Sequence, residues 1–571
     1  MNTNALYSLC KEWLASPTVG EELKAELRAV ENDPDEIKMR FGAPLSFGTA
    51  GLRGLMGAGI GYMNIHTVAQ ATRGLAEHLT SMGGGRVAIA YDTRNNSALF
   101  ARVSAEVLAA SGITCYLFDG PRPTPELSFA VRHFGCLAGI NITASHNPKR
   151  YNGYKAYGAD GAQLSPDEAS AVAARIKDCP LFEVPRMPYE KALAEGYIVL
   201  LGKDTDEAYM KEVLNQRVDP EAIPSEEDMA LVYTPLHGAG ATLVPEVLRR
   251  AGLKTVLTVD EQMLPSGDFP TVTYPNPEFP EAFILATDIA KAHNCDLIIA
   301  TDPDADRMGI QIRVGNDYVG LTGNQVGCLL LDYILTAYRN GKGLPEDAYV
   351  VKSIVTSELA SRICQANGVK IYDVLTGFRF IGEVIKRHEK EGKGTYLLGF
   401  EESYGYLKGT YARDKDAVVA ALLVTEMAAH YRSRGMTLKD ALDSLYERYG
   451  AFDEAVLNLT MDGVDGKERM AALMEKLRAC PPKAFANETI LTARDYKKGT
   501  ITDLVSGTVT ETGLPPSDVL YYTTDHVVLV VRPSGTEPKV KVYFMARGES
   551  KSDTEARLAA CREDVKRLIE G

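Results

Sequence analysis

The sequence lacks the features of a disulfide-stabilised or membrane-spanning protein. Its nine cysteines, an odd number, are scattered from Cys10 to Cys561 and form no C-x-x-C pair. This usage favours the reduced thiols of a cytoplasmic protein. No run approaches about 18 apolar residues, so we expect no membrane span. Residues 1–15 contain Lys11 and Glu12 and lack an apolar signal-peptide core, so they predict an amphipathic helix.

Positive charge is also in short supply. The 571 residues carry 62 Lys and Arg against 76 Asp and Glu, a formal net charge of −14. This balance argues against general nucleic-acid binding and against a basic membrane-binding surface. A local group of cations would still suffice for a small anionic substrate. The 45% hydrophobic and 24% charged content is that of a globular protein with several cores.

Apolar strand-like runs alternate with helical patterns along most of the chain. Residues 86–91 predict a strand, residues 98–111 a helix that ends at Gly112, and residues 417–432 a strongly apolar helix. Such alternation indicates parallel α/β units. Near residue 450 the pattern changes to two strands, followed by a last helix with a capping box that starts at Ser552.

We therefore predict an α/β protein with a smaller C-terminal α+β domain. A polar joint at residues 203–206 and further breaks near residues 315–323 and 449–450 suggest the domain limits. The predicted ranges are 1–205, 206–320, 321–450 and 451–571.

One serine stands where open α/β sheets place their chemistry. Ser145 follows a short apolar run, on a loop at the carboxyl end of a predicted strand, and Asn147-Pro148 forces a turn behind it. The G-x-S-x-G elbow of hydrolases is absent because Thr143 and Asn147 replace its glycines. Ser145 is thus a nucleophile, a phosphate carrier or an ordinary loop residue. Lys155, ten residues further on, supplies a cation.

Three aspartates alternate directly after another predicted strand, at Asp302, Asp304 and Asp306. In an extended loop their carboxylates can converge on one hard cation, which suits Mg²⁺ or Ca²⁺. An EF-hand is excluded because arginine stands where that loop needs its glycine and its glutamate. The alternative is an acidic solvated turn, which the preceding buried strand disfavours.

Three further loops carry polar groups between apolar segments. Residues 532–539 combine charge, hydroxyls and a flexible backbone as a phosphate cradle would, through Arg532, Ser534, Gly535, Thr536 and Lys539. A plain hairpin turn is the equal alternative. Residues 399–405, with Glu401 and Ser403, suit the binding of sugar hydroxyls, and Thr376-Gly377-Phe378-Arg379 is a loop of the same kind. Arg53 lies in a glycine-flanked loop that is either a phosphate contact or a connector.

Together these segments resemble the α-D-phosphohexomutase family of phosphoglucomutases and phosphomannomutases. The matching segments occur in the family's order, at residues 143–148, 302–307, 400–403 and 532–538. Secondary matches resemble the longer, phosphoglucomutase-like bacterial branch, at residues 48–54, 151–155, 233–238 and 321–325.

The resemblance implies three mixed or parallel α/β domains and a smaller C-terminal α+β domain around a central cleft. They would be a phosphoserine domain (1–205), a metal-binding domain (206–320), a sugar-binding domain (321–450) and a phosphate-binding domain (451–571). The resemblance also implies the roles of the site residues. Ser145 would carry a phosphoryl group, and its phosphate would join Asp302, Asp304 and Asp306 around Mg²⁺. Lys155 would handle the proton, with His146 as the second candidate. The substrate contacts would be Arg53, Arg307, Thr376, Gly377, Arg379, Glu401 and Ser403. The phosphate that is not being transferred would bind Arg532, Ser534, Gly535, Thr536 and Lys539.

One position departs from the family pattern. Many relatives carry lysine or histidine in the loop that follows the Thr-Gly pair, whereas this chain has Arg379. Arginine keeps its proton near neutral pH and cannot act as a general base. We therefore expect Arg379 to make an electrostatic contact with the substrate.

The implied activity is that of an intramolecular phosphotransferase. We predict a phosphoglucomutase that interconverts glucose 1-phosphate and glucose 6-phosphate, with glucose 1,6-bisphosphate as intermediate and activator. The alternatives are a phosphopentomutase, a phosphomannomutase, a glucose-1,6-bisphosphate synthase and, last, a non-catalytic phosphosugar-binding protein. The predicted partner is a small phosphosugar, with neither nucleic acid nor membrane, and the protein is a monomer or a dimer.

Overall fold

A computed structural model describes residues 3–461, 466–533 and 539–570. They form two compact units, the first comprising Met1–Thr322, Ile381–Leu398 and Ser403–Gly435, and the second Gly323–Phe380, Gly399–Glu402 and Met436–Gly571. No helix among the described residues is both long enough and apolar enough to span a membrane. All nine cysteines are free thiols, and only Cys480 is exposed.

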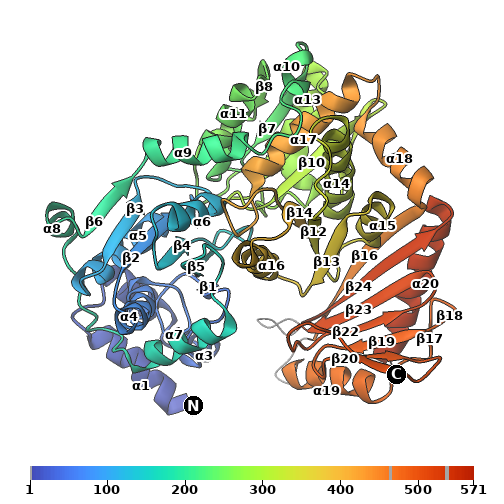
Figure 1. Ribbon diagram of the computed structural model, residues 1–571. Helices are drawn as coiled ribbons and strands as arrows, with labels where there is room; N and C mark the ends of the chain where they lie inside the picture. The colour runs from blue at the N-terminus through green and yellow to red at the C-terminus, as the bar shows by residue number, and fades with distance from the viewer. Residues whose placement is uncertain (1–2, 462–465, 534–538, 571) are drawn as a thin grey trace. The chain divides into compact units, whose positions relative to one another are not determined.

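The first unit begins with a six-stranded sheet in the order β1-β5-β4-β2-β3-β6 (Figure 1). Strands β4, β2, β3 and β6 run parallel to one another. Strand β5 is antiparallel to β4, and β1 is antiparallel to β5. The strands are β1 (Leu52–Leu55), β2 (Arg86–Tyr91), β3 (Thr114–Phe118), β4 (Ala138–Ile142), β5 (Tyr151–Gly158) and β6 (Ile198–Leu201). The helices between them are α4 (Ile65–Ser81), α5 (Ser97–Ala110), α6 (Thr124–His133), α7 (Pro166–Asp178) and α8 (Tyr189–Ala194).

Alternating side chains of β2 face two different helical layers. Val87 and Ile89 pack in the core that contains residues of α4 and α5. Ala88 and Ala90 belong to a second core with Leu127 of α6. Because successive residues of a strand point to opposite faces, an apolar run without polar alternation is what a strand covered on both faces requires. This explains why residues 86–91 could be recognised as a strand.

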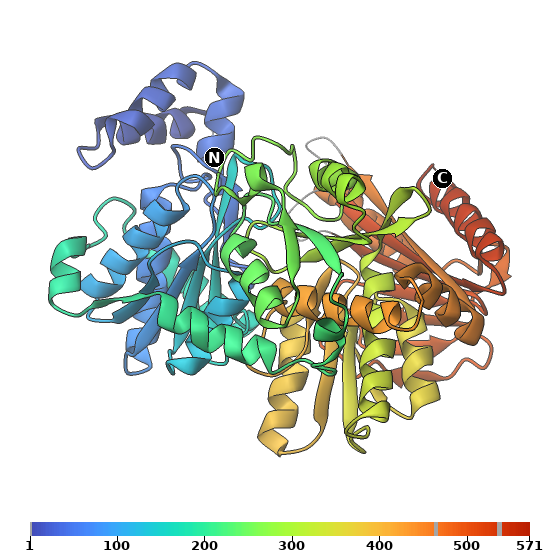
Figure 2. The same ribbon diagram turned by 90° about the horizontal axis from the view of Figure 1, so that it is seen from above.

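Three helices precede this sheet, namely α1 (Thr3–Ala15), α2 (Glu21–Val30) and α3 (Pro34–Phe41) (Figure 2). The single tryptophan, Trp13, is 1% exposed and meets Phe41 and Phe182 edge to face, with ring centroids 6.1 and 5.3 Å away. The predicted N-terminal helix is confirmed. Its apolar face closes a small core of its own.

The first unit also contains a five-stranded sheet in the order β11-β10-β9-β7-β8. Its strands are β7 (Ala230–Thr234), β8 (Thr255–Thr258), β9 (Leu297–Thr301), β10 (Met308–Val314) and β11 (Asp317–Leu321). Strands β9, β7 and β8 are parallel, and β10 and β11 are antiparallel additions. The accompanying helices are α9 (Lys203–Leu214), α10 (Ala222–Ser225), α11 (Gly240–Arg250), α12 (Asp260–Met263), η1 (Pro280–Phe283), α13 (Ile284–His293) and α17 (Ala417–Arg432).

The second unit contains the parallel pair β12 (Ala348–Ser353) and β13 (Lys370–Val374). Helices α14 (Gly323–Asn340), α15 (Glu358–Asn367) and α18 (Leu438–Tyr449) belong to the same unit. The short strand β15 (Gly405–Leu407) lies in the first unit, while α16 (Phe378–Glu391) and β14 (Thr395–Glu401) each have residues in both.

An antiparallel sheet completes the second unit, in the order β16-β24-β23-β22-β19-β20-β21 (Figure 1). Its strands are β16 (Ala451–Thr460), β19 (Thr492–Asp495), β20 (Thr500–Asp503), β21 (Val509–Glu511), β22 (Leu520–Thr523), β23 (Val527–Pro533) and β24 (Lys539–Gly548). A small hairpin, β17 (Ala484–Phe485) and β18 (Glu488–Thr489), and helices α19 (Gly466–Ala479) and α20 (Lys551–Glu570) accompany it. The described elements, α/β sheets with their helices followed by an α+β region, agree with the predicted fold class.

Two local predictions can be compared with the structure. Residues 203–206, the predicted polar joint, form the first turn of α9. The last helix is capped by Ser550, whose Oγ accepts a hydrogen bond from the Asp553 amide at 3.2 Å, so Ser552 lies inside the helix. The S-x-x-acid pattern occurs twice here, and the end of β24 at Gly548 leaves only two residues before the helix begins.

A buried aspartate, Asp416, caps the start of helix α17 and also accepts hydrogen bonds from two tyrosine hydroxyls. The Asp416 carboxylate accepts from the Val418 and Val419 amides at 2.8 and 3.0 Å. Its other oxygen accepts from the hydroxyls of Tyr209 and Tyr411 at 2.8 and 2.6 Å. One side chain therefore caps the start of the helix and satisfies two buried tyrosine hydroxyls.

We expect Asp416→Ala to destabilise the protein by about 3 kcal/mol, because the cap contributes about 1 kcal/mol and each stranded hydroxyl about 1 kcal/mol more. The matched control is Asp33→Ala, which removes an exposed cap with two amide donors and no tyrosine and should cost about 1 kcal/mol. Urea unfolding followed by circular dichroism measures both. Equal losses for the two variants would contradict this account.

Candidate active site

Ser145 lies in a strained turn directly after β4. Its φ is +52°, a left-handed conformation that few non-glycine residues adopt. The Thr143 Oγ1 accepts from the Ser145 amide at 2.8 Å and holds this turn. The Ser145 Oγ donates to Asp302 Oδ2 at 2.7 Å and lies 3.2 Å from His146 Nδ1. The serine loop and the aspartate loop, 157 residues apart in sequence, thus meet.

The three aspartates form one buried cluster at the end of β9. One ligand oxygen from each of Asp302, Asp304 and Asp306 lies within 4.8 Å of the others. Asp302 Oδ1 folds the loop back by accepting from the Asp306 and Arg307 amides, both at 3.1 Å. The loop is thus preorganised by its own first aspartate.

Residues 233–238 and the following Ala239 lie against the aspartate loop. The Ala239 amide donates to the Pro303 carbonyl at 2.8 Å. A Cβ on Gly238 would lie 2.5 Å from the Pro303 Cα, so only glycine allows this approach. His237 is occupied by Leu264 O and Thr271 Oγ1 at 3.0 and 2.9 Å, so its contacts are structural.

The charges of this cluster are consistent with a bound cation. Burial raises the pKa of Asp302 well above its ordinary value, and Asp304 and Asp306 raise it further. Burial also opposes ionisation of Asp304, but the neighbouring Lys155 ammonium favours it, and the pKa of Asp304 is lowered on balance. Among the described residues, Asp304 Oδ1 and Asp306 Oδ1 are buried oxygens that accept no hydrogen bond. All-carboxylate ligation with oxygens to spare fits a hard divalent cation.

Lys155 reaches the cluster from β5. Its ammonium lies 2.7 Å from Asp304 Oδ2 and 3.4 Å from Asp306 Oδ2. Burial alone would lower the pKa of Lys155, but the attraction of the two aspartates is larger and raises it. Lys155 therefore holds its proton in this state of the protein.

The other predicted first-unit residues surround the serine. Arg53 of β1 donates to Asn147 Oδ1 at 3.1 Å. The Arg307 Nε lies 3.8 Å from Asp306 Oδ1. Burial, aided by Arg307 and Arg53, lowers the pKa of His146 well below its ordinary value, so the imidazole beside Ser145 Oγ is neutral. Ser403 also belongs to the first unit, next to Tyr404, whose carbonyl accepts from the Met308 amide at 3.1 Å.

A second group of predicted residues gathers in the second unit. Glu401, the last residue of β14, accepts from the Gly377 amide at 2.7 Å, which joins the predicted sugar loop to the Thr376-Gly377 loop. Burial and the Glu401 charge raise the pKa of Glu402 to about 7. Arg379 lies in the first turn of α16, with its guanidinium carbon 4.3 Å from the centre of the Phe380 ring.

The predicted phosphate cradle is described only at its ends. Arg532 on β23 and Lys541 on β24 are direct partners in the antiparallel register. Lys539 begins β24, and the two predicted neighbouring strands are confirmed. Ser534, Gly535 and Thr536 lie outside the described residues.

The structure adds residues that the sequence patterns did not single out. Lys415 reaches Asp306 Oδ2 at 3.1 Å and Asp414 at 2.8 Å. Thr124 of α6 donates to Asp304 Oδ2 at 2.7 Å. Arg94, after β2, binds backbone carbonyls of the serine loop. The charged run 413–416 before an apolar helix and the polar end of strand 86–91 were the signals that could have revealed them.

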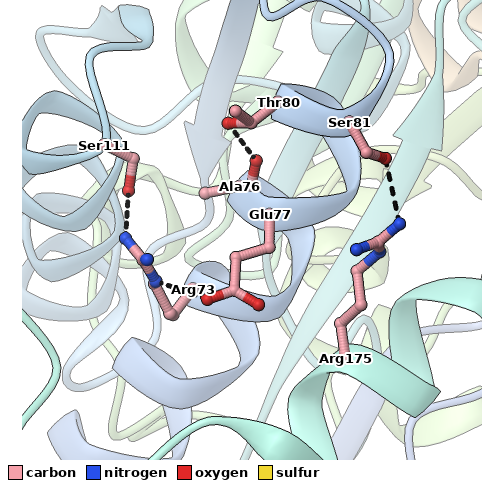
Figure 3. Close-up of a pocket in the computed structure, with 7 residues that line it drawn as sticks. All are labelled: Arg73, Ala76, Glu77, Thr80, Ser81, Ser111 and Arg175. Carbon is pink, nitrogen blue, oxygen red and sulfur yellow. Dashed lines mark hydrogen bonds and ion pairs between the residues drawn. The ribbon is translucent and has the colours of Figure 1, made fainter.

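A surface pocket of about 400 Å³ lies elsewhere in the first unit (Figure 3). Its lining includes Arg73, which binds Glu77 and Ser111, and Arg175, which binds Ser81. Neither the serine loop nor the aspartate loop lines it. This pocket is therefore separate from the serine and aspartate loops.

Comparison with known proteins agrees with this arrangement. Four models of the phosphoglucomutase/phosphomannomutase domains match in order, alpha/beta/alpha domains I, II and III at residues 44–180, 207–315 and 322–449 and the C-terminal domain at residues 471–567. The chain therefore belongs to the phosphoglucomutase/phosphomannomutase family.

Named relatives cover almost the whole chain. A phosphoglucomutase of Staphylococcus saprophyticus is 36% identical over 545 residues, which is 94% of this chain and 96% of the relative. One from Staphylococcus aureus strain USA300 is 37% identical over 531 residues, 92% and 94% of the two chains. The crystal structure of a phosphoglucomutase/phosphomannomutase family protein from Burkholderia thailandensis shares the fold, with a TM-score of 0.66, 19% identity and coverage of 92% and 98%.

A divalent cation should stabilise this protein through the three aspartates. At a cation concentration about 100 times the Kd, binding should add about 2.7 kcal/mol to the stability. Asp302→Asn should fold, because the amide resembles the protonated carboxyl that this site favours without metal, and should lose the cation-induced rise in Tm. Asp317→Asn, on exposed β11, is the control that should keep it. A rise retained by Asp302→Asn would argue against a cation at the cluster.

Proposed function

We propose that this chain is a phosphoglucomutase that interconverts glucose 1-phosphate and glucose 6-phosphate through a phosphorylated Ser145. The carrying observation is the strained serine whose Oγ lies 2.7 Å from Asp302 in a buried carboxylate cluster. Relatives that bear this name and match more than nine-tenths of both chains support the same activity.

Mg²⁺ is the proposed cation, held by Asp302, Asp304, Asp306 and an oxygen on Ser145. When bound, it would neutralise charge on the transferring phosphoryl oxygens. The aspartates fix the ligand oxygens beside the serine, and their burial excludes water from the carrier. Arg307 and Arg53, whose charges both act on His146, would attract the phosphate of the incoming sugar.

In the proposed transfer, a sugar hydroxyl oxygen bonds to phosphorus as the bond from phosphorus to the Ser145 Oγ breaks. The proton lost by the sugar hydroxyl is balanced by the proton that the released Ser145 Oγ gains, and in the return step Ser145 is phosphorylated again from the other end of the bisphosphate. Lys155 carries a proton next to the cluster, so it is placed to donate to an oxygen that gains charge. The neutral His146 imidazole is the second candidate for handling this proton.

The second unit would supply recognition of the sugar and its distal phosphate. Glu401 and the Thr376-Gly377 loop would bind sugar hydroxyls, together with Ser403 of the first unit. Arg379 would make an electrostatic contact with the substrate. The distal phosphate would bind in the loop between β23 and β24, through Arg532, Ser534, Gly535, Thr536 and Lys539. Glucose 1,6-bisphosphate would be both the intermediate and the activator of the reaction.

The proposed domains are the four ranges 1–205, 206–320, 321–450 and 451–571.

Removal of the serine hydroxyl tests the proposal most directly. Ser145→Ala should lose turnover by at least about 10³-fold, because no group remains to carry the phosphoryl. A coupled assay with glucose 1-phosphate and Mg²⁺ measures the rate, and intact mass measures the phosphoryl group. The control, Ser170→Ala, lies on the exposed side of α7 and should match the parent. Full turnover by Ser145→Ala would sink the proposal.

A panel of sugar phosphates separates the related activities. Glucose 1-phosphate should turn over faster than mannose, ribose and deoxyribose 1-phosphates, and glucose 1,6-bisphosphate should accelerate the reaction. A bisphosphate synthase would instead require a separate phosphoryl donor. A preference for a pentose would reassign the chain to a phosphopentomutase.

The proton role of Lys155 is tested by arginine, which keeps the positive charge against Asp304 and Asp306 but does not release its proton near neutral pH. Lys155→Arg should retain the cation-induced rise in Tm and lose about 10²- to 10⁴-fold in kcat. Lys415→Arg is the matched control, since Lys415 also pairs with Asp306, and it should lose far less. If the two variants have the same kcat, Lys155 acts only through its charge.

A further inference from the structure

Arg94 is a buried arginine whose guanidinium is enclosed by backbone and by one carboxylate. It follows β2 in a turn that Asp92 organises, with Asp92 Oδ1 accepting from the Arg94 amide at 2.9 Å and from Ser97 Oγ at 2.7 Å. The other carboxylate oxygen lies 3.2 Å from the Arg94 Nε. Both side chains are fully buried. The carboxylate thus fixes the guanidinium from one edge.

The opposite edge of the guanidinium holds the serine loop. Its Nη2 donates to the carbonyls of Ser145 and Asn147. Its Nη1 donates to the carbonyls of Pro148 and Tyr151 at 3.1 and 3.2 Å. Four carbonyls within seven residues therefore converge on one planar, five-donor group, which only arginine provides. The first of the four belongs to Ser145, whose φ is +52°.

A second strained residue closes the face of the same guanidinium. The Arg94 guanidinium carbon lies 5.0 Å from the centre of the Phe269 ring. Phe269 has a φ of +45°, which is a rare conformation for a bulky side chain. Its loop is held close, because a Cβ on Gly267 would lie 2.2 Å from the Asn95 amide nitrogen and Asp268 accepts from Asn95 at 3.2 Å. Two strained residues from loops far apart in the sequence thus both contact Arg94.

We propose that Arg94 is the positioning residue that holds Ser145 in its reactive geometry, with Phe269 as its backstop. The inference rests on the proposed role of Ser145 as phosphoryl carrier. Strain of this kind persists only where surrounding contacts over-determine it. The guanidinium supplies those contacts by drawing the loop carbonyls inward. With the backbone held there, the Ser145 Oγ points outward to Asp302. Arg94 acts through the backbone of the loop and not on the reacting atoms.

Lysine at position 94 isolates this role from the burial of charge. Arg94→Lys keeps a cation opposite Asp92 but offers its donors from one nitrogen, so it cannot bridge four carbonyls. We expect a loss of about 10²-fold in kcat, the cost of a misplaced reacting group, with the KM for glucose 1-phosphate nearly unchanged. In Arg94→Ala, added guanidinium chloride at concentrations well below the denaturing range should restore part of kcat, whereas sodium chloride should not.

The matched control is Arg40→Lys. Arg40 is also a buried arginine that binds two carboxylates and one backbone carbonyl, that of Ala58 at 3.1 Å, but none in the serine loop. Arg40→Lys should lower Tm and leave kcat unchanged. Phe269→Leu, which leaves the Asp92 and Arg94 pair intact, should lower kcat in the same direction as Arg94→Lys but less. It keeps the proposal testable if the position 94 variants do not fold.

A kcat of the parent's value in folded Arg94→Lys or in Phe269→Leu, or an equal loss in Arg40→Lys, would overturn the positioning role. Ser145→Ala is assayed in parallel. If Ser145→Ala retains turnover, the proposed function itself fails. If Ser145 is required and Arg94→Lys keeps the parent's kcat, only the role of Arg94 fails.

Discussion

Everything in the candidate site depends on keeping several buried carboxylates together at the end of β9. Like charges at such short separations cannot all ionise in a dry interior without cations beside them. Lys155 and Lys415 supply two ammonium groups, and the remaining carboxylate oxygens accept only part of the hydrogen bonds they can take. Buried carboxylate oxygens of the cluster are therefore left to accept a further ligand, and this donor set would suit a hard divalent cation.

This requirement shapes the loops around the cluster. The aspartate loop folds back on Asp302, residues 233–238 approach it through a position that only glycine tolerates, and the serine loop turns through a left-handed residue to reach it. Each of these local conformations costs free energy by itself. They persist because each brings a hydrogen-bonding group to a carboxylate or to a carbonyl that would otherwise be buried without a partner.

The two units divide the chemistry between them. The first holds the serine, the aspartates and the lysines, which are the groups proposed for phosphoryl transfer. The second holds Glu401, the Thr376-Gly377 loop and the paired strands that carry Arg532 and Lys541, which are groups proposed for recognition.

The sequence by itself determined the class of fold, the serine and aspartate loops and the family. Such features depend on short local patterns, because strand-like runs, a turn at Asn147-Pro148 and three spaced aspartates each lie within a few residues.

The sequence did not reveal Arg94, Thr124 or Lys415, because their roles arise from contacts with segments far away in the chain, such as that of Thr124 with Asp304. It also misplaced the cap of the last helix, where two identical patterns overlap and only the end of β24 selects Ser550. The protonation of Lys155 and the neutrality of His146 were likewise decided by tertiary structure alone, because burial and neighbouring charges set a pKa and both exist only in the folded chain.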